Sequence, residues 1–80
     1  MPSRTALDGL AEQFRTDYDS APADRKVASI HLFGIRHHAA LSGVSKHDVA
    51  ERAGLPRSYG TELQKAAVLG EYVEIVRPLA

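Results

Sequence analysis

Four histidines are the residues of this chain that could most readily carry chemistry: His31, His37, His38 and His47. An imidazole ring can bind zinc or transfer a proton near neutral pH. No two of them have the four-residue spacing of helical zinc sites, and the chain contains no cysteine to complete a ligand set. We therefore expect ordinary hydrogen-bonded histidines, with no metal and no other cofactor.

The sequence also lacks a recognisable catalytic grouping. It contains no glycine-rich phosphate loop and no legible pair of nucleophile and base. A chain of 80 residues buries a small core and would struggle to enclose a substrate pocket. These observations predict a binding protein and not an enzyme.

A segment that begins at Lys46 and ends at Leu55 reads KHDVAERAGL. It resembles the first helix and turn of the helix-turn-helix motif in the lactose-repressor family and the phage repressors, where D-V-A-E-x-A-G followed by Val or Leu is frequent. The resemblance covers roughly a quarter of the chain. Residues 30–76 as a whole also resemble small bacterial HTH-like proteins.

The physical requirements of that motif agree with the residues present. Ala50 is small where the second helix would cross the first, and Gly54 can adopt the positive φ of a sharp turn. The positions expected to face the core are Val49, Ala53, Leu55 and Leu63. Two positions depart from the pattern: Pro56 replaces a capping Ser or Thr, and Gly60 replaces a branched apolar residue. We expect the neighbouring Tyr59 to fill the space at Gly60.

In this motif the second helix lies in the major groove, and its first residues contact base edges. The resemblance therefore implies DNA contacts from Lys46, Arg57, Ser58, Thr61, Glu62 and Lys65. Arg57 could read guanine and Lys46 would contact a phosphate, whereas Glu62 could accept from cytosine but would repel the DNA backbone. The alternative is that these residues form an ordinary solvated helix face.

The elements around the motif are predicted from periodicity and capping. A first helix over 5–19 begins with a cap from Thr5 and buries a stripe that includes Phe14. A central helix over 23–41 is apolar most of the way round, with Gly34 at a close helix–helix approach. Gly43 ends it in the left-handed conformation, and Ser45 caps the helix-turn-helix over 46–69, whose second helix we expect from Arg57 to Leu69, ended by Gly70.

Residues 72–76 are β-branched and aromatic and predict one short strand. The fold class is then mainly α: a single domain over 1–80 with four helices and one C-terminal strand, an arrangement compatible with a partial winged helix. Because a lone strand needs a partner, it either pairs with its copy in a second subunit or lies as an extended tail across the helices. The acidic first helix is another surface on which a second subunit could pack.

The charge distribution bears on the partner. Ten basic and ten acidic residues balance, but residues 26–70 hold six Lys and Arg against three Asp and Glu. No apolar run is long enough to span a membrane, and no signal peptide is legible, which predicts a cytoplasmic protein. The leading interpretation is a homodimeric transcriptional regulator that binds double-stranded DNA. The alternative is an HTH-like protein-interaction module of a larger regulatory or defence system, which the neutral net charge favours.

Overall fold

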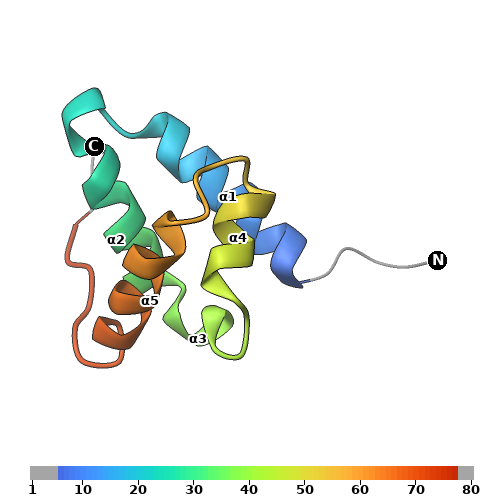
Figure 1. Ribbon diagram of the computed structural model, residues 1–80. Coiled ribbons are helices and arrows are strands. Elements are labelled where there is room, and N and C mark those ends of the chain that lie inside the picture. Colours follow the sequence, from blue (N-terminus) through green and yellow to red (C-terminus); the bar gives the residue numbers. More distant parts are fainter. Residues whose placement is uncertain (1–5, 78–80) are drawn as a thin grey trace.

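The computed structural model describes residues 6–77, which form helices joined by short turns (Figure 1). The elements in chain order are α1 (Ala6–Ser20), the 3₁₀ turn η1 (Ala23–Arg25), α2 (Lys26–Arg36), α3 (His38–Leu41), α4 (Lys46–Arg52) and α5 (Tyr59–Leu69). The prediction of a mainly helical fold is confirmed. Within the described residues no helix combines the length and the apolar character needed to cross a membrane.

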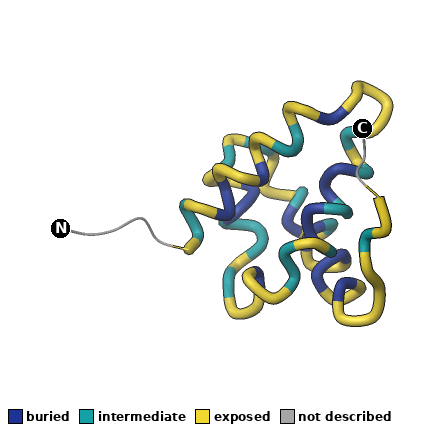
Figure 2. The backbone as a smooth tube through the Cα atoms, turned by 180° about the vertical axis from the view of Figure 1, so that it is seen from behind, coloured by how far each residue is buried: buried dark blue, intermediate teal, exposed yellow. Residues whose placement is uncertain are grey.

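The core is assembled from one large side chain per helix. Helix α5 packs chiefly on α2 and also on α4, while α1 packs on α4 and α2. The largest fully buried side chains are Phe14, Phe33, Leu41, Val49 and Leu63. The buried positions lie on the inward faces of the helices (Figure 2). Each such side chain stabilises the fold by about 1.5–3 kcal/mol, so the short helices depend on one another for their stability.

The central helix predicted over 23–41 is divided into three pieces. Pro22 leads into the turn η1, and α2 begins only at Lys26. At His37 the backbone leaves helical geometry, with φ −107° and ψ 23°, and its ring lies 4.4 Å from that of Phe33. Partial burial lowers the pKa of His37, which favours the neutral ring. The expectation of burial on nearly all sides is also wrong, because Val27 is 62% exposed.

Two helix boundaries differ slightly from the sequence prediction. Helix α1 ends at Ser20, and the predicted cap at Thr5 lies outside the described residues. Helix α5 begins at Tyr59 and not at Arg57, because residues 56–58 form a tighter turn in which the Pro56 carbonyl accepts from the Tyr59 N–H at 3.0 Å.

The predicted C-terminal strand is not present in residues 6–77. Residues after α5 make one further turn, with the N–H groups of Tyr72 and Val73 both bonded to the Leu69 carbonyl, and residues 73–76 then continue without a ladder partner. The segment has β-forming residues, but this part of the chain supplies no second strand to pair with it. The described part of the chain therefore does not form the predicted partial winged helix.

The two glycines expected to need a left-handed backbone have it: φ is 78° at Gly43 and 77° at Gly54. Gly70 differs, with φ −60° and its N–H bonded to the Ala66 carbonyl. Its small size is still required, because a Cβ there would lie 2.7 Å from the Cβ of His38.

Gly34 marks the close approach predicted for α2. A Cβ at this position would lie 2.5 Å from the Cβ of Ala66 and 3.1 Å from the Leu63 carbonyl oxygen. The missing side chain therefore lets α2 and α5 pack backbone against backbone.

We expect Gly34→Ala to destabilise the fold by about 1–3 kcal/mol, because the new methyl group overlaps Ala66 and forces the two helices apart. Gly9→Ala is the matched control, since Gly9 lies in α1 with no atom near its Cβ position, and there the same change should stabilise by up to about 1 kcal/mol. Urea denaturation of both variants measures the difference. Equal stabilities for the two variants would contradict the close packing of α2 and α5.

Candidate nucleic-acid interface

Helices α4 and α5, with the turn between them, form the predicted helix-turn-helix. The Oγ of Ser45 accepts from the Asp48 N–H at 3.2 Å and so caps α4. Gly54 turns the chain, and the Leu55 N–H then returns to the Ala50 carbonyl at 3.0 Å. Val49, Ala50 and Leu63 are fully buried, whereas Ala53 and Leu55 are partly buried against the same core.

The crossing of the two helices depends on Gly60. A Cβ at this residue would lie 2.5 Å from the Cα and 2.6 Å from the backbone nitrogen of His47, neither of which can move without shifting α4. The absence of the branched residue expected at this position is thus explained by a backbone contact. The expectation that Tyr59 fills the space at Gly60 is wrong, because the backbone of His47 occupies that space; Tyr59 packs against the core instead, and its ring centroid lies 6.0 Å from that of Tyr18.

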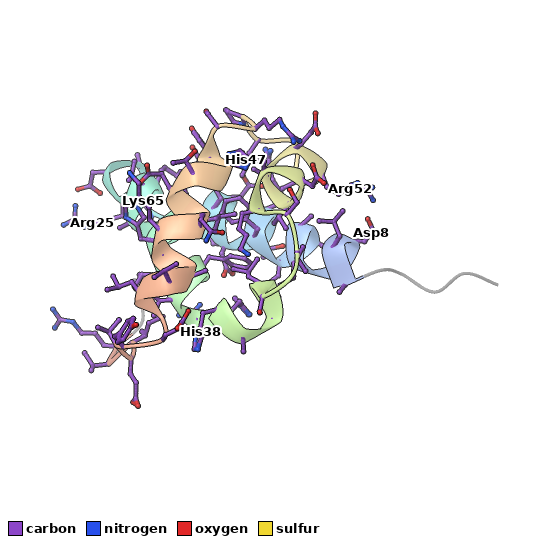
Figure 3. The ribbon with its side chains drawn as sticks, turned by 60° about the horizontal axis from the view of Figure 1, so that its bottom comes forward. Asp8, Arg25, His38, His47, Arg52 and Lys65 are labelled. Atoms are coloured by element: carbon purple, nitrogen blue, oxygen red, sulfur yellow. The ribbon has the colours of Figure 1, made fainter. Side chains whose placement is uncertain are left out.

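Helix α1 supports the turn through contacts that the sequence did not predict. Nη1 of Arg15 lies 3.4 Å from the carbonyl oxygens of both Ala53 and Gly54. Arg52 at the end of α4 forms an ion pair with Asp8 in α1, visible at one side of the molecule in Figure 3. No local pattern could have revealed these contacts, because about forty residues separate the partners in the sequence.

Arg57, the residue predicted to read a base, is held by two carboxylates of α4. Its Nη1 lies 2.7 Å from Oδ1 of Asp48 and 2.9 Å from Oε1 of Glu51. The hydrogen bond from Arg57 is the main reason that the pKa of Asp48 is lowered from its ordinary value. The same contact raises the pKa of the Arg57 guanidinium. The guanidinium therefore remains on the surface with its charge largely compensated.

The Glu62 carboxylate on α5 also has charged or hydrogen-bonding partners. Its Oε1 lies 2.7 Å from Nε2 of His31 in α2, and its Oε2 lies 3.7 Å from Nζ of Lys65. The His31 hydrogen bond is the largest cause of the lowered pKa of Glu62. These partners reduce the repulsion that Glu62 would exert on a phosphate.

The other candidate contacts lie on the outer surface. Ser58, Thr61 and Lys65 are exposed, and the Lys65 side chain retains 69% of its accessible surface. Lys46 is partly exposed and forms no ion pair within residues 6–77. Figure 3 places Lys65 on the opposite side of α5 from the Asp8–Arg52 pair. The outer surface thus presents two amines and two hydroxyls, of which the Lys65 amine lies near Glu62 and the Thr61 hydroxyl near His47.

The histidines make separate contacts and do not converge. His31 bonds Glu62, His38 Nδ1 lies 3.0 Å from the Ile35 carbonyl, and His47 Nε2 lies 3.3 Å from the Thr61 hydroxyl. Within residues 6–77 no group of three or more His, Asp or Glu side chains is arranged to hold a metal ion. His47 is the one that links α4 to the first turn of α5, a role that the sequence analysis left open.

This geometry defines a helix-turn-helix type of domain. A family model described as an HTH-like domain matches residues 6–76, which is most of the chain. The chain therefore belongs to the HTH-like domain family. Comparison with curated proteins and with solved structures gave no match.

We expect Arg57→Met to raise the pKa of Asp48 towards its ordinary value of 3.8, because the principal hydrogen bond to the carboxylate is lost. Arg52→Met is the control, since Arg52 pairs with Asp8 and should leave Asp48 unchanged. Titration of the side-chain carboxyl carbons by NMR gives both values. An unchanged Asp48 pKa in Arg57→Met would contradict the ion pair.

The sign of the pH effect follows from the direction of the shift. The folded-state pKa of Asp48 lies below its unfolded value, so the contribution of the pair to stability is present above the unfolded pKa. That contribution is lost as the pH falls through the folded pKa. Wild type should therefore lose more stability than Arg57→Met on acidification.

Proposed function

We propose that the protein binds double-stranded DNA through α4 and the first turns of α5 and acts as a dimeric transcriptional regulator in the cytoplasm. The observation that carries this proposal is the crossing of α5 over α4 at Gly60, which leaves Ser58, Thr61 and Lys65 on the outer surface. A recognition helix in the major groove uses residues at these positions. The proposed role is binding and not catalysis.

Each exposed group has a role that fits its chemistry. Lys46 and Lys65 would contact phosphates, which fixes the position of the domain on the duplex without reading sequence. The hydroxyls of Ser58 and Thr61 would donate to base edges or phosphates. Arg57 can reach guanine only by exchanging its bonds to Asp48 and Glu51 for bonds to the base.

The carboxylates of α4 limit the binding of random DNA. Asp48 and Glu51 compensate the Arg57 charge, so fewer cations are available to displace counterions from the duplex. We therefore propose modest non-specific affinity and dependence on a second subunit for tight binding. Two half-sites bound by one dimer would supply the missing affinity.

We expect Lys65→Ala to weaken binding to all duplex sequences alike and to lower the salt slope of the binding constant by about one unit, because one phosphate contact is lost. The control is Arg36→Ala, since Arg36 lies in α2 beside Asp17 and outside the proposed surface. Fluorescence anisotropy with a labelled random duplex at several salt concentrations measures both slopes. Equal effects of the two substitutions would contradict the proposed surface.

A protein-interaction module remains the second candidate, and a specific observation favours it. Val68, Leu69 and Tyr72, at and beyond the end of α5, are 48%, 48% and 79% exposed, which is more apolar surface than a DNA contact requires. If folded wild type fails to bind a random duplex even at low salt, the DNA proposal is wrong and this alternative takes its place.

A further inference from the structure

The segment that follows α5 combines strand-forming residues with an unpaired backbone. It has the sequence EYVEIVR over residues 71–77 and runs back beside α2 in Figure 1. Within the described residues, the N–H groups of 74–77 donate no hydrogen bond and no carbonyl of 71–77 accepts one. Residues 70–72 form the turn that closes α5, with the N–H groups of Glu71, Tyr72 and Val73 bonded back to the helix, and only residues 73–76 are extended. An extended stretch with free donors and acceptors is a template for pairing with another strand.

The side chains of this segment alternate as they do in a strand that has one face covered. Val73 and Ile75 are the less exposed apolar residues, and both line a hollow shared with Ile35 of α2. Tyr72 and Val76 face away and are 79% and 92% exposed. Glu74 also lines this hollow and Tyr72 lies in the preceding turn, so the alternation is one of exposure among the apolar residues, and no partner strand is present in residues 6–77.

The charges at the two ends of the segment select a second copy of the chain as the partner. In an antiparallel pair of identical strands, a two-fold axis perpendicular to the ribbon relates the two chains. The residue on this axis lies directly opposite the same residue of the other chain. If that residue is Glu74, each Glu71 faces an Arg77 of the other chain, and two ion pairs form. The remaining apposed pairs are Tyr72 with Val76 and Val73 with Ile75.

Neighbouring symmetric registers are less favourable. Centring on Val73 places Glu71 opposite Ile75, and centring on Ile75 places Arg77 opposite Val73. Each of these two registers places a charged side chain opposite an apolar one and forms no ion pair between Glu71 and Arg77. The chosen register has two costs. The turn at residues 70–72 must open for Glu71 and Tyr72 to join the ribbon, and the two Glu74 carboxylates then face each other.

We propose that residues 71–77 form an antiparallel two-stranded ribbon with the same segment of a second copy, centred on Glu74. Pairing gives the free backbone groups their partners and covers the exposed edge of the segment. This ribbon would be the dimer interface of the proposed regulator. It forms in the absence of DNA and does not require that DNA be the ligand.

Charge reversal tests the pairing directly. Glu71 and Arg77 are six residues apart, roughly 20 Å in an extended chain, so they can pair only between copies. Sedimentation of wild type across a concentration series should reach twice the chain mass of 8.7 kDa. Glu71→Arg alone and Arg77→Glu alone should remain monomeric, whereas an equimolar mixture of the two should form a heterodimer. Glu74→Gln should lower the dissociation constant of the dimer.

Because the chain has no cysteine, single-cysteine variants can test the register. Glu74→Cys should form a disulfide-linked dimer on mild oxidation, since residue 74 lies opposite its copy. Tyr72→Cys is the matched exposed control, and in this register its copies lie roughly 13 Å apart, too far for a disulfide. Equal cross-linking of both variants, or preferential cross-linking through residue 72, would overturn the register.

The two proposals can fail independently. A wild-type chain that stays monomeric at every concentration, or charge-reversed variants that dimerise alone as well as wild type does, would overturn the ribbon whatever the DNA titration shows. Circular dichroism of each variant confirms that the helices remain folded, and failure to bind a random duplex leaves the dimer measurement unaffected.

Discussion

The arrangement of this domain depends on the passage of α5 across two other helices at positions that have no side chain. Gly34 brings α2 against Ala66, and Gly60 brings the start of α5 onto the backbone of His47. Both contacts are too close for a methyl group. They fix the direction of α5, which in turn determines the side chains that face outward and those that complete the core.

Electrostatics modifies what this geometry can do. The surface presents the amines of Lys46 and Lys65, the second of which lies 3.7 Å from Glu62. Arg57 is held between Asp48 and Glu51, and Glu62 is held by His31. A helix-turn-helix with this distribution would contact DNA through few phosphates and would gain from a second subunit. The small number of phosphate contacts would also weaken binding to random DNA, which is in large excess in a cell.

The sequence revealed the local features of the fold and missed those that depend on distant contacts. The cap at Ser45, the turn at Gly54 and the close approach at Gly34 follow from residue type and spacing alone. The break at His37 was not predicted, because an apolar run carries no sign of a change in chain direction. The strand over 72–76 was wrong because β propensity does not supply a partner. For the candidate site, the exposure of Thr61 and Lys65 was predictable, whereas the engagement of Arg57 by α4 depends on side-chain geometry.

The central claim is that α5 and the start of α4 form the DNA-facing surface, and backbone NMR tests it most directly. Addition of a random duplex to labelled wild type should shift the amide signals of residues 46–47 and 57–65 first, with α1 and residues 71–77 little affected. Shifts confined to residues 68–77, or no shift at low salt with the protein folded, would contradict the account.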